Sequence, residues 1–197
     1  MWNAIMDGLF ESIDYQRSDE YIEAERWYEG FEPGQNNDDH DYSQALNTGL
    51  RNCKELRSYC DAIETKAQWT FTLASAVAVL VVTFNDLTPA FLLAAFPSLL
   101  ALLVSMIFSM RARSIVSVPT PYTVQSTVER IENTNFPNAW QAASLHCAAT
   151  GYGVVNDWKG RQIDNAARFL CVAIAWLVIV MLCWATYAVC LPTSPSA

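Results

Sequence analysis

The chain has 197 residues, is 52% hydrophobic and 16% charged, and carries a formal net charge of −8. More than half of the acidic side chains lie in the first forty-odd residues, and this charge disfavours contact with nucleic acid or anionic lipid headgroups, which are also negative. The first residues are amphipathic and acidic, whereas a signal peptide begins with a basic region before an apolar one, so no cleaved signal is expected.

Residues 1–41 form an acidic N-terminal region. Apolar side chains at helical spacing predict an amphipathic helix over 2–14 and a second helical piece over 20–31. A polar face rich in acids favours packing against protein over lying on lipid. Residues 32–41 have the composition of a linker. The acidic cluster around His40 in that linker is interpreted as a solvated loop, and no metal ion is expected there.

Aromatic side chains of this region could contact a soluble protein partner. Tryptophan and tyrosine dominate the energetics of such interfaces because they bury large areas. Packing on the chain's own helices is the competing interpretation. The candidate partner contacts are Trp2, Trp27 and Tyr28.

Residues 42–67 predict a cytosolic helix with a heptad seam. Its members follow one another at alternating spacings of three and four: Leu46, Leu50, Cys53, Leu56, Cys60, Ile63 and Ala67. Such a seam packs against another helix, either from the same chain or from a second copy, and the sequence leaves both open. No helix breaker precedes the apolar run that follows, so we expect one continuous helix.

Residues 68–110 predict a transmembrane hairpin. Neither 69–84 nor 87–110 contains a charged side chain, and each run is close to the roughly 20 residues that cross a bilayer core about 30 Å thick. Pro97 is expected to kink the second span, because proline removes a backbone hydrogen bond.

The remaining chain predicts a cytosolic helical segment, a third span and a short external tail. These parts are residues 111–168, 169–191 and 192–197. Within the first of them we expect short helices over 123–133 and 138–150, a turn at Gly151-Tyr-Gly153, and a helix over 154–168 that continues into the third span. The third run again has no charged side chain.

The predicted fold class is an all-α integral membrane protein with three transmembrane helices and cytosolic helical segments. Every lysine and arginine lies before residue 69 or within 111–168. Cytoplasmic loops carry an excess of these residues. We therefore expect the N-terminus and the 111–168 segment in the cytoplasm, and the hairpin turn and C-terminus outside.

Catalytic patterns are missing from the sequence. His146 and Cys147 are adjacent, and adjacent positions on a helix point about 100° apart. No zinc spacing, Rossmann glycine pattern, phosphate loop or Ser/His/Asp set is found, and ionisable side chains are missing from the spans, which argues against a proton-coupled transporter. We expect no enzymatic activity, no cofactor and no metal, and we interpret the six cysteines as reduced thiols.

Charged residues gather where two predicted spans begin. Lys66 can reach the lipid headgroups while Asp61 and Glu64 lie within a turn of it. Lys159 and Arg161 stand before the third span in a similar way. We predict that Asp61, Glu64 and Lys66 lie at the membrane interface, although an ordinary lysine at the membrane edge would also account for Lys66.

The stretch ETKAQWTFTLASAVAVL resembles the start of the first span in Pycsar-type transmembrane effectors of bacterial anti-phage defence, and the general layout is similar over roughly residues 45–190. The resemblance implies an effector in the bacterial inner membrane that oligomerises and disrupts that membrane when triggered. It also implies that five charged residues at the membrane interface couple the cytosolic helices to the spans: Asp61, Glu64, Lys66, Lys159 and Arg161. No motif for a cyclic nucleotide trigger is found, so a partner protein could supply the signal. The alternative is a non-toxic membrane-anchoring or sensing subunit of a complex with a soluble protein.

Overall fold

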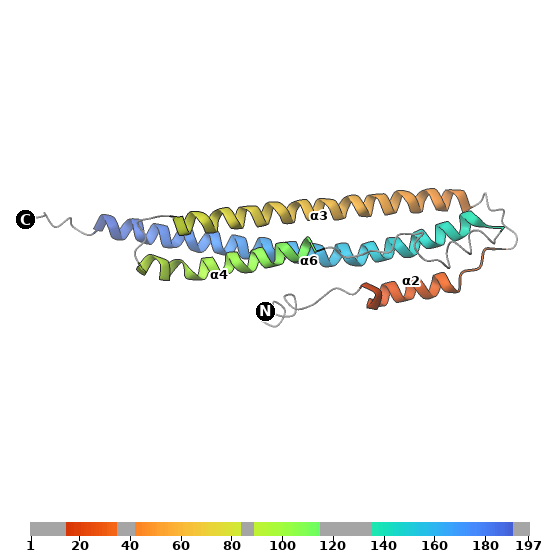
Figure 1. The fold of residues 1–197 in the computed structure, drawn as a ribbon, viewed down its shortest axis with the longest axis horizontal. Helices are drawn as coiled ribbons and strands as arrows, with labels where there is room; N and C mark the ends of the chain where they lie inside the picture. The colour runs from red at the N-terminus through yellow and green to blue at the C-terminus, as the bar shows by residue number, and fades with distance from the viewer. Residues whose placement is uncertain (1–14, 35–41, 84–88, 115–134, 191–197) are drawn as a thin grey trace, which may run out of the picture. The chain divides into compact units, whose positions relative to one another are not determined.

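The computed structural model describes residues 15–34, 42–83, 89–114 and 135–190. Over these residues the regular structure is entirely helical (Figure 1). It consists of the 3-10 turn η1 (Tyr15–Arg17) and the helices α2 (Asp19–Glu29), α3 (Ser43–Thr83), α4 (Pro89–Ala112) and α6 (Pro137–Cys190). The all-α prediction is confirmed. The helices predicted over 2–14 and 123–133 lie outside the described residues, as do Trp2 and His40.

The chain divides into two compact units, each assembled from two stretches of sequence. The head unit comprises Met1–Glu64 and Ser114–Gly160, and the span unit comprises Thr65–Arg113 and Arg161–Ala197. α2 belongs to the head unit and α4 to the span unit. The division falls inside α3 and inside α6, so each of these helices contributes residues to both units.

α2 is bounded by local signals that its sequence carries. The Ser18 side chain accepts a hydrogen bond from the backbone N–H of Tyr21 at 3.2 Å, which caps the helix N-terminus. Two acids, Asp19 and Glu20, stand in the first turn, where negative charge is favoured by the helix dipole. The helix predicted over 20–31 is therefore confirmed with an earlier end, at Glu29, followed by Gly30.

α3 extends over 41 residues without interruption. The sequence between Ser43 and Thr83 contains no proline, and its one glycine, Gly49, is tolerated within the helix. The predicted continuity from the heptad seam into the first apolar run is confirmed.

The turn predicted at Gly151-Tyr-Gly153 is wrong. α6 runs through these residues as one helix of 54 residues, and no glycine in the described residues has a positive φ. Each helical glycine costs about 1 kcal/mol relative to alanine. Burial of Leu145 and Ala148 before the glycines, and of Val155 and Trp158 after them, offsets this cost.

Three helices, α3, α4 and α6, are long and apolar enough to cross a membrane, judged by length and composition. The chain is thus a helical membrane protein. Pro97 lies inside α4, which continues through it. The indole N–H of Trp176 on α6 donates to the Ala94 carbonyl at 2.9 Å, one turn before this proline.

The interior of the span unit combines small and large apolar side chains from its three helices. Ala74 of α3 packs with Leu102 of α4 and with Leu170 and Ala173 of α6. Small residues let helices approach closely, and this close packing drives association in lipid. Large apolar side chains point outward, as contact with lipid requires; they include Val79, Val82, Leu93, Phe96, Leu103, Met110, Val172 and Leu182.

Three buried serines on α4 provide a test of this packing. Ser105 donates to the Ala166 carbonyl at 2.7 Å, whereas the hydroxyls of Ser98 and Ser109 have no hydrogen-bond partner among the described residues. We expect Ser105→Ala to lower the free energy of unfolding by about 0.6–1.7 kcal/mol. The matched change Ser98→Ala should be neutral or stabilising, because it removes an unsatisfied buried group. Thermal unfolding of the two variants in lipid nanodiscs compares them, and equal losses would contradict the expectation.

Candidate functional site

Polar contacts join α3 and α6 along the heptad seam of the head unit. The Cys53 thiol donates to the Leu145 carbonyl at 3.5 Å. The side-chain amide of Asn156 donates to the Leu56 carbonyl at 2.9 Å. The seam of α3 therefore packs on a helix of the same chain at these positions, which is one of the two possibilities that the sequence left open. Self-association stays a prediction.

The seam ends in a cluster of Cys60, Glu64 and Lys159. The Lys159 ammonium pairs with the Glu64 carboxylate and also donates to the Cys60 sulfur at 3.5 Å. The Lys159 side chain is only 3% exposed, whereas that of Glu64 is 42% exposed. A buried ammonium is strongly destabilised without a partner. The head unit therefore depends on Glu64 to hold Lys159 in its charged, buried position.

The cysteines of the head unit sit in surroundings that keep them as thiols. Burial raises the pKa of Cys60, and the nearby Lys159 ammonium acts in the opposite direction with a smaller effect. Burial also raises the pKa of Cys53 and of Cys147. Because the thiolate is the reactive form, these pKa values favour structural roles at neutral pH.

Of the five predicted coupling residues, the structure brings Glu64 and Lys159 together. Asp61 is exposed on α3 in the head unit. Lys66 and Arg161 belong to the span unit and are exposed on α3 and α6. Sequence reasoning missed the pairing partner of Lys159, because Glu64 lies 95 residues earlier in the chain. It also missed Asn156, because its partner, the Leu56 carbonyl, lies 100 residues earlier in the chain and the residues next to it give no local signal.

The aromatic side chains around α2 pack on the first turns of α6. Trp27 meets the His146 ring edge-on with centroids 5.1 Å apart, and Tyr28 meets Trp140 in the same way at 5.9 Å. Phe31 also packs against Trp140, at 5.4 Å. Trp27 and Tyr28 are the two candidate partner contacts that the structure describes. Both pack against side chains of their own chain, although Trp27 remains 47% exposed.

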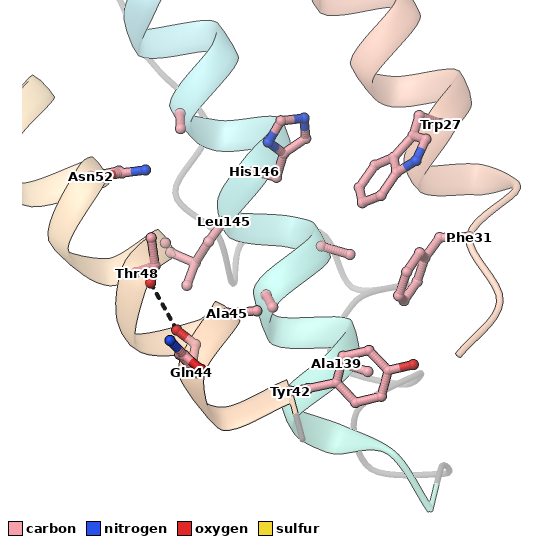
Figure 2. A pocket seen from close by; sticks show the side chains of 14 residues that line it. Trp27, Phe31, Tyr42, Gln44, Ala45, Thr48, Asn52, Ala139, Leu145 and His146 are labelled. Atoms are coloured by element: carbon pink, nitrogen blue, oxygen red, sulfur yellow. Dashed lines mark hydrogen bonds between the residues drawn. The ribbon is translucent and has the colours of Figure 1, made fainter. Parts of the chain in front are cut away.

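A pocket of about 620 Å³ opens between α2, the start of α3 and the start of α6. Figure 2 shows Trp27 and Phe31 on one side, Thr48 and Asn52 on the α3 side, and Leu145 on α6. Sequence periodicity could not reveal this pocket, since it forms only when three separate segments come together.

Gly49 lies where α3 and α6 approach each other closely beside this pocket. A Cβ atom added there would lie 3.1 Å from the Leu145 Cβ and 3.3 Å from its Cδ1, and Leu145 is 1% exposed. At Gly153 an added Cβ would meet nothing within 4 Å. Gly49 therefore permits the contact between α3 and α6, whereas no neighbouring side chain requires a glycine at position 153.

These two glycines give opposite expectations for the addition of a side chain. Gly153→Ala should raise the free energy of unfolding by about 0.5–1 kcal/mol, because alanine favours helix. Gly49→Val should lower it by about 1–3 kcal/mol, because the added methyl groups overpack against Leu145. Thermal unfolding of both variants measures the difference, and a stabilising Gly49→Val would refute the close approach.

No group of three or more histidine, cysteine, aspartate or glutamate side chains that could bind a metal ion occurs in the part of the chain that the structure describes. No known protein family, curated protein or solved structure matches the chain. Function must therefore be inferred from the helices that the two units share, the ion pair at the end of the seam, and the pocket.

Proposed function

We propose that this chain is a membrane effector of bacterial anti-phage defence. In this proposal the head unit receives a signal, and several copies of the span unit then disrupt the inner membrane. The observation that carries the proposal is that α3 and α6 each contribute residues to both units. A change at the seam of the head unit can pass along helices that have no break between the two units, because their backbone hydrogen bonds continue from turn to turn.

The ion pair of Glu64 and Lys159 supplies the element that such a signal would act on. A buried charged pair fixes one register between two helices, because any other register leaves a charge unpaired. The pair lies in the last residues of the head unit on both helices. A signal that shifts α3 against α6 must break it. The pair therefore holds the resting state in this proposal.

The packing of the N-terminal aromatics supports the effector over the anchoring subunit. A subunit that only binds a soluble protein needs free anchor side chains, and aromatics are the usual anchors. Tyr28 and Phe31 instead pack on Trp140 of the same chain, and Trp27 packs on His146 although it is 47% exposed. The proposal gives the chain no catalytic step and no cofactor, and leaves the source of the signal to a partner or small molecule.

Membrane potential during phage challenge tests the proposal. Bacteria that express the chain should lose the potential after infection, as read with a voltage-sensitive dye, and uninfected cells should keep it. Infected cells without the chain are the control. If cells that express the chain keep their potential under every phage challenge, the effector proposal fails and the anchoring subunit becomes the better interpretation.

The proposal places the head unit in the cytoplasm, following the distribution of lysine and arginine. Alkaline phosphatase, which is active only in the periplasm, should be active when it is fused after Ala197 and silent when it is inserted near Asn133. The opposite pattern would invert the orientation and would remove a cytoplasmic signal from the mechanism.

A further inference from the structure

The walls of the head-unit pocket are mainly of two kinds. Three aromatic rings, those of Trp27, Phe31 and Tyr42, line one part. Small side chains of α3 and α6 line another part: Ala45, Ala139, Ala142, Ala143 and Ala149. Leu145 and His146 of α6 also line the pocket. Small residues opposite aromatic rings leave space for a flat ring to lie between them. The Tyr42 ring is held in place, because its hydroxyl accepts a hydrogen bond from the Gly34 N–H at 2.9 Å.

The described lining of the pocket offers hydrogen bonds and no permanently charged side chain. Among the described residues that line it there is no aspartate, glutamate, lysine or arginine, and His146 contributes an imidazole. The side-chain amides of Gln44 and Asn52 line it and have no hydrogen-bond partner among the described residues. Figure 2 shows the Asn52 amide directed toward α6. An amide presents one donor and one acceptor side by side, so it matches a ligand edge with the complementary pair.

A charged ligand would fit this lining poorly. An anion is held by a lysine or arginine side chain or by several backbone N–H groups, and a cation on aromatic faces is held more firmly when a carboxylate balances its charge. The described residues that line the pocket supply neither a lysine, an arginine nor a carboxylate. Transfer of an unpaired charge into an apolar site is costly. The volume of about 620 Å³ lies within the range of small-molecule sites and exceeds the size of a single ring.

We propose that the pocket between α2, α3 and α6 binds an uncharged planar aromatic molecule with an amide-like edge. The ring system lies against Trp27 and Phe31, and the amide of Asn52 binds the polar edge. This site is independent of the proposed membrane disruption, since binding can be measured whether or not the membrane potential responds.

Three isosteric probes that differ in charge test the proposal. Benzamide is neutral, benzoate is an anion, and benzamidine is a cation at neutral pH. The full chain in nanodiscs is labelled with 5-fluorotryptophan, and the resonance of Trp27 is assigned by its loss in Trp27→Phe. Benzamide should shift this resonance saturably, and each charged probe should bind at least about tenfold more weakly.

Two variants locate the binding site. Ala142→Leu fills the pocket and should abolish the benzamide shift, and Asn52→Leu should weaken benzamide binding by roughly three- to tenfold because the edge loses its partner. Unchanged resonances of the other tryptophans show that each variant is folded. Asn52 is exposed, so Asn52→Leu should fold and can still test the proposal if Ala142→Leu does not fold. Gly153→Ala, away from the pocket, is the control and should bind normally.

Several results would overturn the proposal. Benzamide could produce no saturable shift, or it could bind Ala142→Leu and Asn52→Leu as well as the wild type. If benzamidine binds more tightly than benzamide, the pocket is an aromatic cage for cations. If benzoate binds more tightly than benzamide, the pocket is an anion site.

Discussion

Replacing Glu64 with glutamine is expected to destabilise the head unit by roughly 2–4 kcal/mol, because the buried Lys159 ammonium loses its charged partner. Replacing Lys159 with methionine is expected to cost less than about 1 kcal/mol, since methionine has a similar shape and is readily buried. The asymmetry follows from exposure. Glu64 is 42% exposed and can be hydrated when it is left alone, whereas Lys159 is 3% exposed and cannot.

Amide hydrogen exchange of the full chain in nanodiscs, read by mass spectrometry, measures this difference in peptides from residues 137–160. The control is Glu55→Gln, which removes the exposed ion pair of Arg51 and Glu55 on α3. Arg51 and Glu55 are 80% and 63% exposed, and exposed pairs contribute about 0–1 kcal/mol, so this change should be nearly neutral. Equal losses for Glu64→Gln and Lys159→Met would show that Lys159 is not buried as a cation.

Most of the fold could be predicted because its signals are local. The runs 69–84, 87–110 and 169–191 lack charge, and the stretch from Ser43 to Thr83 lacks a breaker. These features predict long apolar helices without any knowledge of packing. The prediction of a turn at Gly151-Tyr-Gly153 is wrong because it relied on a local signal alone. Glycine favours the end of a helix, but burial of residues on both sides of these glycines outweighs that preference.

The candidate site could be predicted only in part, because its contacts join distant segments. Glu64 and Lys159 were both identified as charges near the membrane, but their pairing depends on the register of α3 against α6. Periodicity along one helix carries no information about that register. The pocket was missed for the same reason, as Trp27 and His146 meet only when α2 packs on α6.

Substitutions at Lys66 are expected to show whether the proposed signalling depends on the charge at this position, on an unbroken α3, or on both. Lys66 is exposed on α3 just after the head unit ends, so changes there do not disturb packing. Lys66→Ala keeps the helix and should keep depolarisation after phage challenge. Lys66→Glu places a negative charge against anionic lipid, at a cost on the order of 1 kcal/mol or more, and should abolish depolarisation without preventing membrane insertion.

Lys66→Pro should also abolish depolarisation, for a different reason. Proline within a helix removes the hydrogen bond to the carbonyl four residues earlier and costs about 3 kcal/mol locally. It would therefore interrupt α3 at the residues where the head unit ends and the span unit begins along the chain. The control is Ser43→Pro at the first residue of α3, a position that tolerates proline. Voltage-sensitive dye reports depolarisation, and membrane fractionation confirms insertion of each variant. If Lys66→Pro inserts and still depolarises infected cells, the span unit does not respond through α3, and α6 is then the remaining continuous helix through which the head unit could act.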